Sequence, residues 1–223
     1  MRKLLATVLA AAGLLFATQI AAAEDVPPFS YEDCPEQLPP GAMGWRCEVL
    51  VADGTGKFGA LGTLNLGRQR LTFAEGQLNG RYAQVFGALR AEPTTVPGGL
   101  FGNRLVPLAF QVQYGGSSDF HGLGFVALKL KVISPLLPRT CFIGTDSDPI
   151  IVAPQTRTQP VEVAPGVYKA TMQDKRFAIP RAHGCGIFTR IVEHRFGVPS
   201  AAGTNEITLP TYTSIKQYDA SHS

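Results

Sequence analysis

Apolar and polar residues alternate along several segments of the chain, most clearly over residues 124–133. One face of this segment would carry Val126, Leu128, Leu130 and Val132, and the other Ala127, Lys129 and Lys131. A period of two is typical of a strand with one buried face. We expect further strands over residues 46–52, 105–114, 149–153, 167–172 and 207–215.

Glycine and proline punctuate these segments, with 24 Gly and 17 Pro in the chain. Such residues terminate strands and form turns, which we expect at Gly67 and at residues 79–80, 97–99 and 115–116. Several short strands joined by turns are typical of β-sandwiches and related barrels. The pattern predicts a mainly β fold: a single sandwich-like or barrel-like domain.

A helical pattern interrupts the strands once, over residues 186–196. Apolar residues recur there at three-to-four spacing from Ile187 to Phe196. Gly197 stands where a left-handed helix end is needed, and Pro199 follows. We predict one short helix in the C-terminal half, packed on the sheets by its apolar stripe.

The N-terminus has the pattern of a secretory signal. Arg2 and Lys3 precede an apolar run over residues 4–20, and three alanines end at Ala23. Small residues before the cut are what signal peptidase requires, so we expect cleavage after residue 23. The alternative is a membrane anchor, because the apolar run is close to the minimum length that spans a bilayer. We favour cleavage, since the alanine-rich exit is typical of signal peptides.

The remaining residues, 24–223, suit one ordinary domain. We expect its ends to be loose: residues 24–40 extended and the polar tail after Tyr218 frayed. Without Arg2 and Lys3 this part has 18 basic and 17 acidic residues. Its near-neutral charge gives no reason to expect nucleic acid, anionic lipid or an acidic polymer as partner.

Four cysteines lie in this exported part, an even number that favours two disulfides. Four cysteines allow three pairings. We expect Cys34–Cys47, which would close a Pro/Gly-rich loop, and Cys141–Cys185, which would join a central strand to a late turn. A metal site is disfavoured, because the cysteines are widely spaced and no Cys-x-x-Cys occurs.

Residues 54–59 match the G-x-G-x-x-G pattern of nucleotide-binding loops. That pattern binds a pyrophosphate only where its glycines open a helix. The residues that follow, 60–66, are glycine-broken and strand-like. We therefore predict a glycine-rich hairpin and no cofactor.

Ser118, Asp119 and His121 form the nearest approach to a hydrolase-like cluster. Neighbours in one loop seldom form a triad, because a serine nucleophile needs its base and orienting carboxylate at set distances. A polar turn between two strands is the better interpretation, with Asp119 capping backbone N–H groups. No G-x-S-x-G motif occurs, so we assign no catalytic residue.

The other histidines and carboxylates that could form a site are scattered along the chain. His183 and His194 flank Cys185, but their spacing fits no recognised metal site, so we expect no metal. Carboxylates such as Glu75, Asp146 and Asp148 can meet in space, although nothing in the sequence selects a pair.

Three segments of the C-terminal half resemble a group of functionally uncharacterised secreted proteins of actinobacteria. They are the Cys-aromatic-Ile-Gly segment at residues 140–144, the Ala-x-Gly-Cys-Gly turn at 182–186 and the Pro-Ser-x-Ala-Gly-x-Asn ending at 199–205. The resemblance spans residues 123–209 and supports the Cys141–Cys185 bond. It implies secretion and carries no catalytic residue over to this chain.

From these observations we expect a secreted protein, extracellular or associated with the cell envelope. We favour a non-catalytic protein that binds a surface component, since β-sandwiches present binding loops readily. A secreted hydrolase with an unrecognised site is the first alternative, and a β-barrel of an outer lipid layer is the second.

Overall fold

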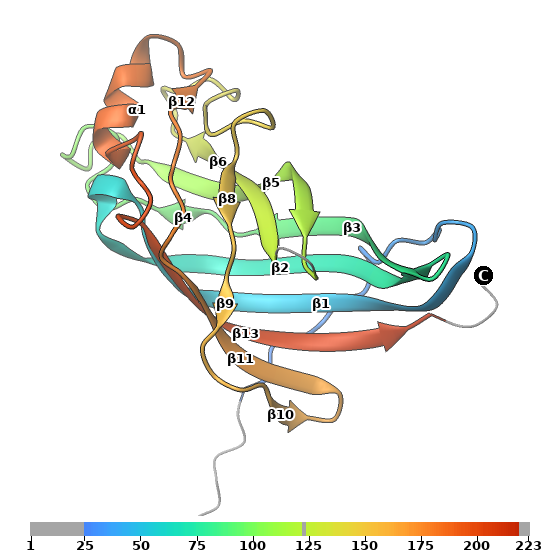
Figure 1. Ribbon diagram of the computed structural model, residues 1–223. Coiled ribbons are helices and arrows are strands. Elements are labelled where there is room, and N and C mark those ends of the chain that lie inside the picture. The colour runs from blue at the N-terminus through green and yellow to red at the C-terminus, as the bar shows by residue number, and fades with distance from the viewer. Residues whose placement is uncertain (1–24, 122–123, 219–223) are drawn as a thin grey trace, which may run out of the picture.

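The computed structural model describes residues 25–121 and 124–218, so the expected signal at 1–23 and the end of the tail lie outside the described residues. The described chain is mainly β, with two antiparallel sheets and one short helix, which confirms the predicted sandwich-like domain (Figure 1). No helix among these residues has the length and apolar composition needed to cross a bilayer.

The first sheet, here called the long sheet, has seven strands over the described residues. Its strands lie side by side in the order β10 (Val161–Ala164), β11 (Val167–Asp174), β13 (Glu206–Gln217), β1 (Ala42–Lys57), β2 (Thr63–Leu78) and β3 (Arg81–Ala91), and β9 (Gln155–Thr156) pairs with β11. The second, here called the small sheet, has six in the same part of the chain: β12 (Ala182–His183), β7 (Phe142–Ile143), β6 (Phe125–Ile133), β5 (Ala109–Asp119) and β4 (Thr94–Thr95), with β8 (Ile150–Val152) beside β6.

The small sheet packs on only one half of the long sheet, which we call the closed end (Figure 1). The main core lies between the two sheets and includes Phe58, Leu66, Phe110 and Ile207. We call the face of the long sheet that looks toward the small sheet its inner face. The other half, where β1 begins and β13 ends, is the open end, where the end of β5 and the residues that follow it lie over the inner face.

The predicted helix is present: a 3-10 turn, η2 (Gly186–Phe188), leads directly into α1 (Thr189–Phe196). Val192 and Phe196 are its buried residues, whereas Ile187, at the start of the predicted apolar stripe, is 90% exposed. Gly197 ends the helix in the left-handed conformation at φ 66°. The predicted glycine-rich hairpin at 54–59 is also confirmed: β1 runs into η1 (Gly59–Leu61), and β2 returns antiparallel.

Two predicted turns are wrong, for one physical reason. Gly67 lies inside β2, and residues 115–116 lie inside β5 at a break in its register with β6. A Cβ on Gly67 would lie 2.8 Å from the Cβ of Glu92, and one on Gly115 would lie 3.0 Å from the backbone of Ala127. These glycines therefore allow segments to approach closely, and they do not reverse the chain.

The expectation that residues 24–40 are loose also needs correction. On the outer face of the long sheet, the buried apolar side chains of β1 contact Phe29, Tyr31 and Cys34. Asp33 binds two arginines of that sheet, Arg90 at 2.5 and 2.6 Å and Arg70 at 2.9 Å. The hydrogen bonds from Arg90 come first among the causes that lower the pKa of Asp33. Ion pairs and apolar contacts thus hold this segment to the sheet.

Candidate functional site

Ser118 and Asp119 end β5, and His121 follows, so the predicted polar cluster lies where the small sheet reaches over the open end. Gln84 on β3 fastens this segment through its side-chain amide. Its Nε2 donates to the Ser118 carbonyl at 2.7 Å, and its Oε1 accepts from the Phe120 N–H at 3.0 Å. The amide replaces the ladder hydrogen bonds that an adjacent strand would supply.

A pair of carboxylates lies on the inner face at this end. Arg46 and Glu48 share a parity of β1, and Arg46 is the register partner of Glu75 on β2. The Arg46 guanidinium donates to Glu48 at 2.7 Å and also to Glu75. The side chains of Glu48 and Glu75 both contact this guanidinium, and they are only 13% and 11% exposed. Two strands thus bring two half-buried carboxyl groups together.

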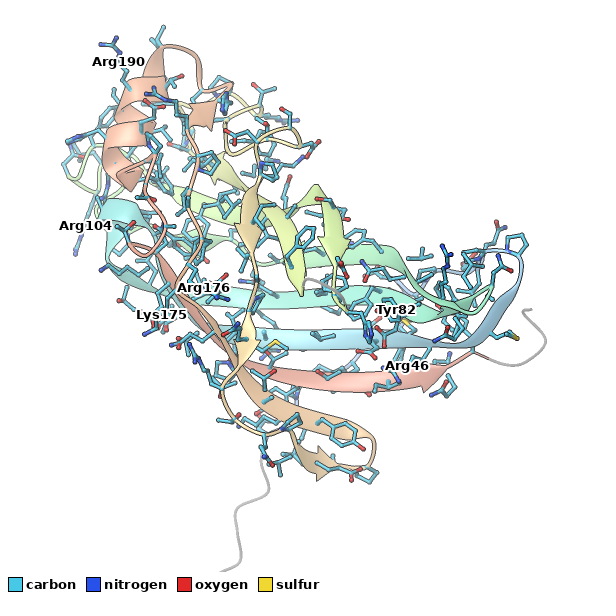
Figure 2. All side chains as sticks on the ribbon, viewed as in Figure 1. Arg46, Tyr82, Arg104, Lys175, Arg176 and Arg190 are labelled. Atoms are coloured by element: carbon cyan, nitrogen blue, oxygen red, sulfur yellow. A yellow bond between two sulfur atoms is a disulfide. The ribbon has the colours of Figure 1, made fainter. Side chains whose placement is uncertain are left out.

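Tyr82 connects this pair to the predicted cluster. Its hydroxyl donates to Glu75 Oε2 at 2.5 Å, and its ring stacks on His121 with centroids 4.1 Å apart. Figure 2 shows Tyr82 and Arg46 on the half of the long sheet that lies away from α1. The site therefore combines β1, β2, β3 and the segment after β5.

The two carboxyl groups have opposite pKa shifts. Burial, followed by the hydrogen bond and the charge of Glu75, raises the pKa of Glu48 to about 7. Burial would also raise the pKa of Glu75, but the hydrogen bond from Tyr82, that with Glu48 and the charge of Arg46 outweigh it and lower this pKa. Near pH 7 the pair thus carries about half a proton on average, with Glu75 ionised and Glu48 close to half-protonated.

Aromatic stacks line the inner face beside the carboxylates. Phe73 on β2 stacks on Phe120 with centroids 4.3 Å apart, and Phe86 on β3 stacks on Tyr114 of β5 at 3.6 Å. These contacts hold the end of β5 above the long sheet. The carboxylate pair consequently has an apolar, rigid neighbourhood on the side of the small sheet.

The other residues considered from the sequence do not join this site. His183 lies on β12 and His194 on α1, both at the closed end, and Cys185 is in a disulfide. Asp146 pairs with Lys129 at 2.7 Å. Within the described ranges, no group of three or more His, Cys, Asp or Glu side chains is arranged to hold a metal ion.

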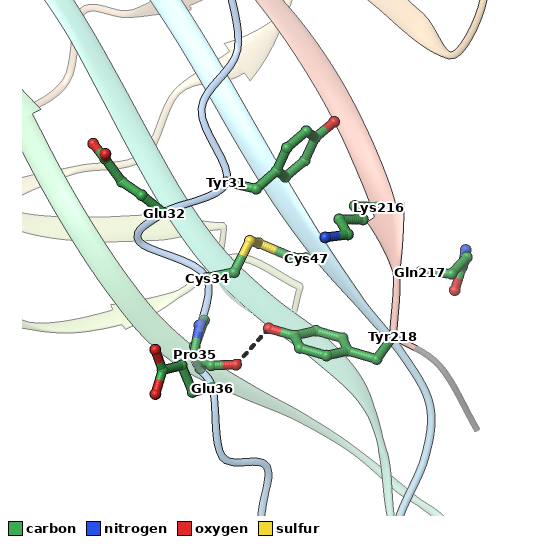
Figure 3. A pocket seen from close by; sticks show the side chains of 9 residues that line it. All are labelled: Tyr31, Glu32, Cys34, Pro35, Glu36, Cys47, Lys216, Gln217 and Tyr218. Carbon is green, nitrogen blue, oxygen red and sulfur yellow. Dashed lines mark hydrogen bonds between the residues drawn. A yellow bond between two sulfur atoms is a disulfide. The ribbon is translucent and has the colours of Figure 1, made fainter. Parts of the chain in front are cut away.

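Both expected disulfides are present, Cys34–Cys47 and Cys141–Cys185. The first lies in a cleft of about 490 Å³ on the outer face, between residues 31–36 and the end of β13 (Figure 3). Tyr218 donates to the Pro35 carbonyl at 2.9 Å across this cleft. The polar groups here join two chain segments, so we regard the cleft as a structural junction.

Four members of the site were not predicted from the sequence: Arg46, Glu48, Tyr82 and Gln84. The sequence did carry a signal for two of them. Arg46 and Glu48 are charged residues on one face of a predicted strand whose other face is apolar. Charged residues on the half-buried face of a strand need partners, which the sequence did not identify.

No protein family, no curated protein and no solved structure matches the chain.

Proposed function

We propose that this chain is an exported protein that acts outside the cytoplasm and binds a saccharide component of the cell envelope at the open end. The signal-like N-terminus and the two disulfides support export, because disulfides persist in oxidising compartments. The resemblance to secreted actinobacterial proteins points to the same location. The carboxylate pair Glu48–Glu75, with Arg46, Tyr82 and His121 around it, carries the assignment of the site.

The arrangement suits a ligand rich in hydroxyl groups. Ionised Glu75 accepts hydrogen bonds, protonated Glu48 donates one, and Arg46, which is 44% exposed, has further N–H groups. The stacked rings of Tyr82 and His121 present an aromatic edge beside these groups. Sugars offer both hydroxyls and apolar ring faces, so they match this combination. Anionic ligands fit less well, because the site holds two carboxyl groups and lies near Asp119.

Solution NMR tests this proposal. We expect soluble tetramers of N-acetylglucosamine or of glucose to shift amide resonances of β1, β2 and β3 around Glu48, Glu75 and Tyr82. Glu75→Gln should weaken binding about tenfold or more, because a charged hydrogen-bond acceptor contributes about 1.5–3 kcal/mol. Glu36→Gln, at the rim of the outer cleft, is the matched control and should bind normally. Shifts that map to the closed end, or none at all, would contradict the proposal.

A hydrolase is the second candidate, because the two carboxyl groups have pKa values displaced in opposite directions. Such displacement is a mark of acid–base sites. Both carboxyl groups accept hydrogen bonds from the guanidinium of Arg46, whereas the two carboxylates of a glycosidase lie roughly 5–9.5 Å apart on either side of the scissile bond. The pair therefore resembles a dyad that shares one proton more than a pair that flanks a glycosidic bond.

Turnover distinguishes the two candidates. A binding protein leaves the tetramers intact after prolonged incubation, as judged by mass spectrometry. A hydrolase would release shorter products, and Glu48→Gln would abolish their release without loss of binding.

A further inference from the structure

Positively charged side chains without an ion-pair partner lie in three segments at the end of the molecule that contains α1. Residues 97–106, 134–140 and 181–196 contain five arginines and one acid. The acid, Glu193, lies 3.7 Å from Arg181. Among the described residues, no ion pair involves three exposed arginines of these segments, Arg104, Arg139 and Arg190. The rest of residues 24–223, by contrast, has 13 basic and 16 acidic residues, a net negative charge.

Exposed apolar side chains accompany these arginines. Ile187 is 90% exposed and Leu105 is 81% exposed, higher values than for any other large apolar side chain in the described part of the chain. Phe101 and Leu136 add 44% and 45%. Each stands within three residues of an arginine of the same end. Exposed apolar side chains gathered at one end of a protein are typical of a surface that contacts a membrane or another molecule.

The three segments form one rigid end. Arg195 of α1 donates to the Gly99 carbonyl at 2.9 Å and to the Pro97 carbonyl, which holds residues 97–106 against the helix. Thr140 Oγ1 donates to the Gly184 carbonyl at 3.0 Å and so connects the other two segments, which the adjacent disulfide Cys141–Cys185 also holds together. Figure 2 shows Arg104 and Arg190 on this end, opposite to the side of Arg46 and Tyr82.

We propose that this end docks on the surface of a lipid bilayer that contains anionic headgroups. Arginines attract anionic lipids, and neighbouring apolar side chains enter the interface, the combination that peripheral membrane binding uses. Ile187 and Leu105 would insert, while Arg104 and Arg190 would contact phosphate groups. The open end, with its carboxylate pair, would then face away from the bilayer. The inference does not depend on the proposed saccharide site.

Vesicle co-sedimentation of the purified protein tests the proposal. We expect binding to phosphatidylcholine vesicles that contain about 30 mol% phosphatidylglycerol to exceed binding to pure phosphatidylcholine at least tenfold, and to fall with added salt. Arg104→Glu with Arg190→Glu should reduce the binding about tenfold or more. Leu105→Asp with Ile187→Asp should also reduce it, because the inserted apolar groups are lost and the added carboxylates are repelled by the anionic headgroups.

The control carries the same kinds of change at the far edge of the long sheet. Arg157→Glu with Val161→Asp replaces an exposed arginine and a 60% exposed valine near β10, and it should bind vesicles normally. Circular dichroism checks that each variant is folded. Equal binding to both kinds of vesicle, or equal losses in the control, would overturn the proposal. Salt-sensitive binding to soluble polyphosphate without vesicle binding would overturn it too, in favour of a polymer partner.

Discussion

The two ends of the long sheet use the same strands in opposite ways. At the closed end, Leu66 of β2 and Ile207 of β13 face the small sheet together with Phe58, which directly follows β1, and the interior is apolar. At the open end the same strands present Arg46, Glu48 and Glu75 on the same face. The open end obtains its apolar packing on the outer face, from residues 25–40.

This difference separates stability from chemistry. The closed end removes large side chains from water and supplies most of the folding free energy. The open end contains half-buried charges, which are expensive unless paired, and it therefore carries the groups best suited to bind or transfer protons. Four changes test this division, in order of expected effect.

Truncation of the closed-end core should give the largest loss. Phe110 is fully buried and packs edge-on against Phe58 at 5.5 Å and Phe196 at 6.1 Å. Phe110→Ala should lower the free energy of unfolding by about 3–5 kcal/mol in urea titrations. Phe120→Ala, which removes a half-buried ring of the open end, should cost only about 1–2 kcal/mol. Equal losses would show that the two ends do not differ as described.

The disulfides should differ in the same sense. Cys34 and Cys47 line a cleft, whereas Cys141 and Cys185 are both 0% exposed. Under mild thiol treatment the first bond should be reduced before the second, as alkylation and mass spectrometry would show. Cys34→Ser with Cys47→Ser should cost about 3 kcal/mol and open residues 25–40 to protease, against about 4 kcal/mol for the longer loop of the other pair. Reduction of Cys141–Cys185 first would contradict this order.

Glu48 should make the stability of the open end depend on pH. Its pKa in the fold is about 7, against an ordinary value of 4.5, so the folded state binds more protons between these two values. Stability from Glu48 therefore falls as the pH rises from 4.5 to 7, and the cost is complete above 7. Glu48→Gln mimics the protonated group, so it should raise stability at pH 8 by about 1–2 kcal/mol and change little at pH 5.

Urea titrations at both values of pH would measure this effect. Glu75 works in the opposite direction: its pKa is lowered, so its contribution is complete above 4.5 and disappears as the pH falls through its folded value. Glu75→Gln should consequently destabilise at pH 8. A gain in stability for both variants would mean that the pair does not share a proton.

The smallest effects belong to the aromatic partners of the pair. Tyr82→Phe removes the 2.5 Å hydrogen bond to Glu75 and should cost about 1–2 kcal/mol, with a rise in the pKa of Glu75 that carboxyl NMR would detect. His121→Ala removes a ring stacked on the surface and should cost about 0.5 kcal/mol. The matched control, exposed His183→Ala, should be neutral.

Strand alternation made much of the closed end predictable. The parity of residues 126–132 matches the buried side of β6, and the helix ends at Gly197 as expected. The strands β2 and β3 were missed over most of their lengths, since their inner face changes from apolar at Leu66 to charged at Glu75 and gives no uniform alternation. The same mixture that hides these strands in the sequence is what forms the candidate site.

Sequence patterns alone were enough to predict the β class, the short helix and two disulfides, because alternation, helical spacing and an even number of cysteines are visible without the fold. The tertiary structure alone decided which charges meet. Glu48 and Glu75 lie 27 positions apart, and their contact depends on the antiparallel register of β1 and β2. Likewise, the near-neutral composition concealed the basic end, because net charge is a sum over residues whereas an electric field depends on their positions.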